Sequence, residues 1–165
     1  MALHQLSKYL RSFAVMAMLA LTISLTAGCE PDVPTETVYP VLNGEDVVFS
    51  QLLGKVVFIN YWADWCRPCR VEIPELNAFA ERYKDEVRVL SVNFDGVHGA
   101  RLAKQVKSLD IRFDTLLVDP RAMFGATASG ALPETLVIDR AGVLFSVLIG
   151  PQTSDSLNEV LRSVP

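Results

Sequence analysis

Two cysteines, Cys66 and Cys69, stand two residues apart and are the clearest candidates for chemistry in this chain of 165 residues. An apolar run at 56–62 precedes them, and a segment with helical periodicity follows. Two thiols with this spacing, between a buried strand and the start of a helix, predict a redox pair that cycles between dithiol and disulfide. Half of a zinc site is the alternative, but zinc needs about four ligands, and the only histidines are His4 and His98. We therefore favour disulfide exchange over metal binding.

The two thiols are expected to have different roles. Cys66 falls where the helix should begin, and the unpaired N–H groups of a helix N-terminus stabilise a negative charge. The pKa of the Cys66 thiol should therefore be lowered, which favours the reactive thiolate, and Arg67 adds a positive charge beside it. Cys69 lies one turn further on and should be less exposed. Cys66 is the predicted nucleophile, and Cys69 is the predicted resolving thiol.

The first 28 residues differ from the rest of the chain. Lys8 and Arg11 form a basic start, and residues 12–27 carry no charge. This pattern predicts a secretory signal peptide at 1–28. A retained membrane anchor is the alternative, although the apolar stretch is short for a stable span, which needs about 20 residues.

The end of this segment, Leu25-Thr26-Ala27-Gly28-Cys29, resembles the bacterial lipobox, with leucine one place earlier than in its commonest form. The resemblance implies that Cys29 is lipidated, becomes the new N-terminus and anchors the protein to a bacterial membrane. Resemblance to the sorting rule of enteric lipoproteins, in which Asp in the next position retains the protein at the inner membrane, implies that Glu30 favours the outer membrane. Residues 29–40 contain three prolines and are expected to form an extended tether. Since the chain has three cysteines, lipidation of Cys29 leaves only the redox pair.

The charge of the mature chain excludes one class of partner. Removal of residues 1–28 takes away two of 15 Lys and Arg residues and none of 19 Asp and Glu, so the net charge changes from −4 to −6. Nucleic-acid-binding proteins present a basic face. We therefore expect no nucleic-acid partner.

Strand and helix patterns alternate through residues 41–165, which we expect to form one domain. An α/β fold with a central mixed sheet flanked by helices accounts for this alternation. Asn43-Gly44 predicts a hairpin with a two-residue turn between Val41-Leu42 and 47–49. The further expected strands are 56–62, 87–92, 116–118, 135–138 and 143–148, and the expected helical segments are 67–83, 102–109, 122–124 and 157–164, the last capped by Thr153 or Ser154.

Several motifs together resemble the thioredoxin superfamily, and in particular its TlpA/ResA-like periplasmic branch. They are Gly54-Lys55-Val56-Val57, the run from Asn60 to Cys69, Glu72-Ile73-Pro74, and the run from Leu132 to Asp139. The resemblance covers residue 38 to the C-terminus. It implies a thioredoxin-like fold with an N-terminal β-hairpin and an insertion at 95–124, after the first βαβ unit.

The resemblance also implies an activity. It is that of a thiol-disulfide oxidoreductase that reduces disulfides in exported proteins, with apocytochrome c among the candidate substrates. Electrons would come from a membrane thiol reductant of the DsbD/CcdA type. No metal or organic cofactor is expected.

Further site residues follow from the same resemblance. Pro133 corresponds to the cis-proline that faces the redox pair and holds Leu132 extended, so that its backbone can pair with a substrate peptide. Glu72 corresponds to a glutamate that assists proton movement at the cysteines. Asn60 stands where cytosolic thioredoxins often have a buried aspartate, so Glu72 is the expected proton carrier. Trp65 should present an apolar face beside Cys66 for substrate docking.

Three other functions remain open from the sequence. The pair could hold Cu(I) as an assembly chaperone, because soft thiolates suit that ion, with His98 as a further ligand. The pair could instead act as an oxidising thiol exchanger. A peroxidase of similar fold is disfavoured, because no separate peroxidatic cysteine is present.

Overall fold

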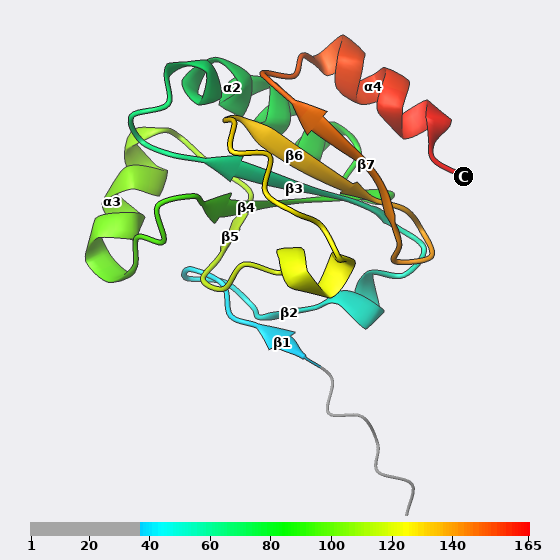
Figure 1. Cartoon of the computed structure of the whole chain (residues 1–165), viewed down its shortest axis with the longest axis horizontal. Helices are drawn as coiled ribbons and strands as arrows, with labels where there is room; N and C mark the ends of the chain where they lie inside the picture. The colour runs from blue at the N-terminus through cyan, green and yellow to red at the C-terminus, as the bar shows by residue number, and fades with distance from the viewer. Residues whose placement is uncertain (1–36) are drawn as a thin grey trace, which may run out of the picture. The chain divides into compact units, whose positions relative to one another are not determined.

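The computed structural model describes residues 37–165, so the predicted signal peptide, Cys29 and most of the predicted tether lie outside the described residues. A five-stranded sheet in the order β5-β4-β3-β6-β7 forms the centre of the domain (Figure 1). Its strands are β3 (Val56–Trp62), β4 (Val87–Asn93), β5 (Asp114–Leu116), β6 (Glu134–Ile138) and β7 (Leu144–Ile149). The helices are α2 (Arg67–Arg82), α3 (Gly99–Ser108) and α4 (Ser154–Ser163).

β3 is the middle strand, and all seven of its residues are buried. It pairs in parallel with β4 and antiparallel with β6. β5 is parallel to β4, and β7 is antiparallel to β6. The mixed sheet expected from the sequence is confirmed, and cover on both faces of the sheet accounts for β3, which is apolar apart from Asn60.

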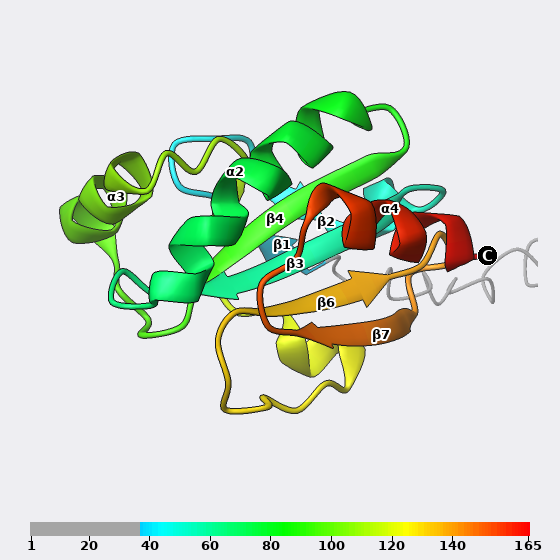
Figure 2. The same ribbon diagram turned by 90° about the horizontal axis from the view of Figure 1, so that it is seen from above.

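α2 and α4 cover one face of the sheet (Figure 2). Leu76 and Phe79 of α2 and Leu157 of α4 are buried against the strands, and Phe58 contacts Phe79 edge to face at 5.1 Å between ring centroids. The predicted N-cap of α4 is present, since Thr153 accepts a hydrogen bond from the backbone N–H of Ser156. This layer fixes the position of α2, on which the cysteines lie.

The opposite face is covered by short elements: β1 (Val38–Tyr39), β2 (Val47–Val48), and the 3-10 helices η1 (Phe49–Leu52) and η2 (Arg121–Phe124). Phe49 lies between Tyr39 and Phe124, with edge-to-face ring contacts at 5.1 and 5.0 Å. β1 begins inside the range 29–40 that the sequence assigned to the tether. The folded domain therefore includes Val38 and Tyr39.

The N-terminal hairpin is confirmed, but its predicted two-residue turn is wrong. β1 pairs with β2 through Val38↔Val48 and Tyr39↔Val47, and residues 40–46 connect them. The backbone of Leu42 instead donates to the carbonyl of Thr115 at 2.9 Å, beside an isolated bridge between Val41 and Leu116. Residues 41–42, which were expected to form the first strand of the hairpin, therefore pair with the end of β5.

A third hydrophobic cluster lies at the carboxyl end of β3, where α3 packs against the start of α2. It contains Trp62, Ile73 and Leu102 together with Cys66 and Cys69. α3 belongs to the insertion between β4 and β5. β5 ends two residues before its predicted end, because the N–H of Leu117 donates to the carbonyl of Pro40 at 2.8 Å.

Candidate redox site

The cysteines lie at the junction between β3 and α2. Cys66 is the N-cap of α2, with extended backbone dihedral angles, and the backbone N–H of Cys66 donates to the carbonyl of Ala63 at 3.2 Å. Cys69 lies in the first turn of α2 and forms a disulfide with Cys66, with 5.4 Å between the Cα atoms. The structure therefore places the predicted redox pair at a helix N-terminus.

The two sulfurs have different surroundings. Both cysteines are buried in the oxidised protein, and Cys69, at 0% exposed, is less exposed than Cys66, at 3%, which is the predicted order. The backbone N–H of Cys69 points at the Cys66 Sγ, 3.2 Å away. In the reduced protein this donor and the helix dipole would stabilise a thiolate on Cys66.

Trp65 precedes the redox pair and is 64% exposed. Its indole N–H donates to a carboxylate oxygen of Asp95 at 2.9 Å, so the loop after β4 orients the ring. Trp62, by contrast, is completely buried. The structure thus leaves an apolar ring available beside Cys66, as the sequence predicted for Trp65.

The Leu132–Pro133 peptide bond is cis, as the resemblance implied. The Pro133 carbonyl accepts a hydrogen bond from the N–H of Gly150 at 2.9 Å, which joins this loop to the end of β7. Leu132 is half-buried and packs against the cluster that contains both cysteines. Of the predicted substrate-binding residues, Leu132 therefore contacts the apolar surroundings of the redox pair.

Glu72 is completely buried, one turn after Cys69. One carboxylate oxygen accepts from the Asn60 side chain, and the other accepts from the backbone N–H of Gln152 at 2.8 Å. Burial disfavours the charged form and outweighs these two hydrogen bonds, so the pKa of Glu72 is raised to about 7. A carboxyl group with this pKa can accept and release protons near neutral pH.

Asn60 and Glu72, which the family resemblance relates by role, are in direct contact. The Asn60 amide also donates to the Thr135 hydroxyl at 3.0 Å. Gln152 was not anticipated, because it contributes a backbone group from a segment far along the chain. A sequence pattern does not reveal such a donor.

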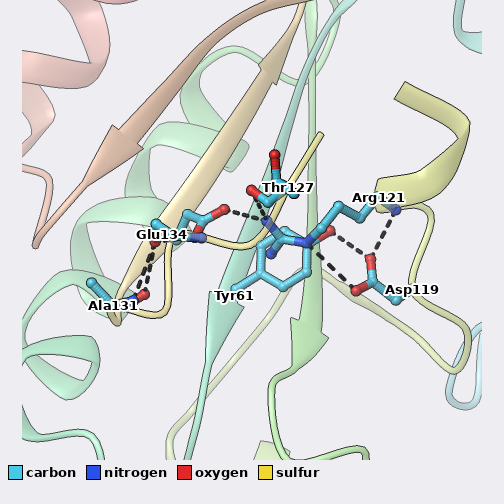
Figure 3. A network of polar contacts seen from close by, with 7 residues as sticks. Tyr61, Asp119, Arg121, Thr127, Ala131 and Glu134 are labelled. Carbon is cyan, nitrogen blue, oxygen red and sulfur yellow. Dashed lines mark hydrogen bonds and ion pairs between the residues drawn. The ribbon is translucent and has the colours of Figure 1, made fainter. Parts of the chain in front are cut away.

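A second polar network was also missed (Figure 3). Arg121 forms an ion pair with Glu134, and Tyr61 donates to Asp119 at 2.7 Å. The available signal was Glu134 itself, an acidic residue directly after Pro133 at the start of an otherwise uncharged strand.

The structure does not bring His98 into the site. It is an exposed residue that precedes α3, and its side chain makes no capping hydrogen bond. Within residues 37–165, no group of three or more His, Cys, Asp or Glu side chains is arranged to hold a metal ion. No helix in the same range has the length and apolar character needed to span a membrane.

Comparison with known proteins agrees with this geometry. The model of the AhpC/TSA family matches residues 31–147. The thiol-disulfide oxidoreductase ResA of Bacillus cereus is 31% identical over 124 residues, which are 74% of this chain and 71% of that protein.

Solved structures show the same fold. The exposed lipoprotein thioredoxin of Streptococcus pneumoniae has a TM-score of 0.65 at 26% identity, covering 78% of this chain and 98% of that one. A thiol:disulfide interchange protein DsbE from Chlorobium tepidum has a TM-score of 0.60 at 26% identity, covering 75% and 87%. The family match, the ResA relative and the Cys66–Cys69 disulfide lead to one conclusion: the chain belongs to the AhpC/TSA family of thioredoxin-like proteins and is a thiol-disulfide oxidoreductase.

Proposed function

We propose that this oxidoreductase reduces disulfide bonds in exported proteins from a position at a bacterial membrane. The observation that carries the proposal is the Cys66–Cys69 disulfide at the N-terminus of α2, with Leu132 of the cis-proline loop packed on the same cluster. This arrangement combines a redox-active sulfur with a neighbouring loop to which a peptide can bind. Trp65 offers a further apolar contact surface.

The reaction transfers two electrons to the substrate in two exchange steps. The Cys66 thiolate attacks one sulfur of the substrate disulfide, and the other substrate sulfur leaves as a thiolate that takes a proton from solvent. The Cys69 thiolate then attacks the Cys66 Sγ, which breaks the mixed disulfide and releases the second substrate thiolate. The substrate gains two electrons, and the protein retains the Cys66–Cys69 disulfide.

Glu72 is the proposed acceptor of the Cys69 proton. A completely buried thiol cannot lose its proton directly to water, and Glu72 lies three residues further along the same helix. Its pKa of about 7 suits exchange of this proton in both directions. A Glu72→Gln variant should form the mixed disulfide normally but resolve it about 100-fold more slowly.

The cycle requires a dithiol that reduces the Cys66–Cys69 disulfide again. We propose that a membrane thiol reductant of the DsbD/CcdA type supplies it, and that disulfides of exported proteins, with apocytochrome c as one candidate, consume the electrons. The names of the relatives, a thiol-disulfide oxidoreductase and a thiol:disulfide interchange protein, support disulfide exchange as the reaction. The reduction potential tests it, because a value near −120 mV, which is typical of the strong oxidant DsbA, would instead indicate an oxidising exchanger.

The location is part of the same proposal. Residues 1–28 would be removed as a lipoprotein signal, and Cys29 would carry the lipid that anchors a periplasmic domain through a short tether. The solved exposed lipoprotein thioredoxin is a precedent for this organisation in the same fold. Cys29→Ala should move the protein from the membrane fraction to the soluble fraction, and an unchanged membrane fraction would argue for an uncleaved anchor.

A trapping experiment tests the reaction and identifies the substrate. Cys69→Ser removes the resolving thiol, so the mixed disulfide on Cys66 should accumulate and can be identified by mass spectrometry. The Cys66→Ser/Cys69→Ser double variant is the matched control and should trap nothing. Full disulfide reductase activity in Cys66→Ser would contradict the mechanism.

A further inference from the structure

Arg121 is a nearly buried cation next to the cis-proline loop. Its side chain is 11% exposed, and its guanidinium carbon lies 3.9 Å from the centre of the Tyr61 ring in β3. The guanidinium also forms an ion pair with Asp119, with 3.7 Å between Nε and Oδ2. Figure 3 shows the side chain extending from η2 between Tyr61, Asp119 and Glu134. The Tyr61 ring and the Asp119 carboxylate therefore hold the guanidinium in place.

Glu134 receives the other end of this guanidinium. It directly follows Pro133, its side chain is 2% exposed, and one carboxylate oxygen accepts a hydrogen bond from Arg121 Nη1. The other oxygen accepts from the backbone N–H of Ser129 at 2.9 Å and from the Ser129 hydroxyl. Burial alone would raise the pKa of Glu134, but the hydrogen bonds from Ser129 and Arg121 outweigh it and hold the pKa below its ordinary value. The carboxylate therefore connects Arg121 to the middle of the loop.

The ends of the loop at 125–133 are held by the packing of Ala126 and Leu132 and by the hydrogen bond between Gly150 and Pro133, but its middle has little else to hold it. It contains no helix or strand, and residues 127–131 are exposed, so burial of apolar side chains does not fix that part. Arg121 Nη1 donates to the Thr127 carbonyl at 3.2 Å, and the N–H of Ala131 donates to the Ser129 hydroxyl at 3.2 Å. The exposed part of the loop is thus held by hydrogen bonds that lead back to Arg121 and Glu134.

We propose that Arg121 is a positioning residue for peptide substrates, which acts through Glu134 to hold Leu132 and Pro133 in their binding position. The inference rests on the proposed function, in which a substrate peptide binds along Leu132. Loss of the guanidinium leaves the buried Glu134 carboxylate without its cation, and such a group must either take up a proton or move towards water. Either change releases Ser129 and the exposed residues of the loop. The sulfur chemistry at the N-terminus of α2 does not depend on these contacts.

The chemistry of Arg121 also predicts that lysine cannot replace it. The planar guanidinium donates to Glu134 and Thr127 while it stacks on Tyr61. An ammonium group retains the charge but has neither the fork geometry nor the flat face. Arg121→Lys should therefore keep the fold better than Arg121→Gln and still weaken peptide binding.

The test is single-turnover reduction by the reduced protein of two substrates, the disulfides of insulin and a small aromatic disulfide, dithiobis(nitrobenzoic acid). In Arg121→Gln the half-saturating insulin concentration should rise about tenfold, which corresponds to about 1.4 kcal/mol of binding free energy. The maximal rate and the rate with the small disulfide should stay within about twofold of the wild-type values. The reduction potential should shift by no more than the amount that corresponds to a roughly twofold change in the equilibrium constant. Glu134→Gln should likewise raise the half-saturating insulin concentration and leave the other quantities unchanged. The double variant should bind insulin no more weakly than either single variant, because both substitutions remove the same Arg121–Glu134 contact.

Arg88→Gln is the matched control. It breaks another arginine–aspartate pair, Arg88–Asp114 between β4 and β5, and should leave insulin binding unchanged. If Arg121→Gln does not fold, Ser129→Ala removes the hydroxyl contacts to Glu134 and to the backbone of Ala131, and should raise the half-saturating insulin concentration about threefold.

The outcomes separate the two proposals. Normal insulin binding in folded Arg121→Gln or Ser129→Ala would overturn the positioning role, and so would an equal loss with both substrates. A wild-type protein that does not reduce insulin or any other peptide disulfide would overturn the proposed function itself.

Discussion

Replacement of Glu72 by glutamine should make the oxidised protein more stable at pH 8 than the wild type. The pKa of Glu72 is about 7 in the folded protein and has an ordinary value of 4.5. Each pKa unit corresponds to about 1.4 kcal/mol, so ionising this buried carboxyl costs the folded state about 3 kcal/mol. Glutamine has nearly the same shape but no charge to bury.

The sign of the pH dependence follows from where protons are bound. Below pH 4.5 the carboxyl is protonated in both states. Between pH 4.5 and 7 the unfolded chain loses the proton while the folded chain keeps it, so the free energy of unfolding falls as the pH rises. The wild type should lose up to about 3 kcal/mol from this group across that window, and the glutamine variant should lose none.

The structure offers a partner for the amide that Glu72→Gln introduces. The side-chain oxygen of Asn60 is buried and has no hydrogen-bond partner within the described residues. The introduced amide could donate to that oxygen after rotation of the Asn60 side chain, and its own oxygen could still accept from the backbone N–H of Gln152. Both polar groups of the introduced amide therefore have a partner, although rotation of Asn60 removes its donation to the Thr135 hydroxyl, which can instead donate to the Asn60 oxygen.

Urea unfolding of the oxidised proteins, followed by tryptophan fluorescence from about pH 4.5 to 8.5, measures the difference across the window in which the carboxyl titrates. Glu75→Gln is the matched control, because Glu75 lies on the same helix and its pKa is lowered by hydrogen bonds from Ser154. That variant should show no gain in stability at pH 8. A constant difference between wild type and Glu72→Gln across the pH range, or a less stable variant at pH 8, would refute the reasoning.

Three further substitutions test the fold. Thr153→Ala removes the side-chain cap of α4 and should lower the free energy of unfolding by about 1 kcal/mol in urea titrations, whereas no change would mean that water replaces the cap. Leu157→Ala empties a completely buried position between α4 and the sheet, and we expect a loss of about 2–5 kcal/mol in the same assay, with a smaller loss indicating collapse of the site. Gly44→Ala would place a Cβ atom 3.0 Å from the Val41 side chain and 3.2 Å from the Asp114 carboxylate, so thermal unfolding should reveal a loss of about 1–3 kcal/mol, and wild-type stability would show that these side chains move aside.

Local features of the site could be predicted because they depend on neighbouring residues. The burial of β3, the helix that starts at Cys66 and the greater burial of Cys69 all follow from the pattern around one pentapeptide. The cis bond before Pro133 came from the family resemblance and not from the residues alone. Such features require no knowledge of which distant segments meet.

The parts that could not be predicted depend on contacts between distant segments. Val41 has the pattern of a hairpin strand, but its neighbours pair with the end of β5. Arg121 and Glu134 are separated by a loop without regular structure, so no periodicity relates their side chains. In each case the sequence predicts the local character of an individual residue, but tertiary packing determines which residue it contacts.

The hydrogen bonds from α2 to the segment before α4 have a consequence for biosynthesis. Glu72 accepts from the N–H of Gln152, and Glu75 accepts from the N–H of Ser154 at 2.9 Å and from its hydroxyl. A growing chain contains both cysteines well before these donors are synthesised. Its thiols would be accessible at that stage, but the proton-handling carboxyl group would still be without its backbone partner. Resolution of a mixed disulfide should therefore reach its full rate only after residues up to Ser154 have been synthesised and have packed against α2.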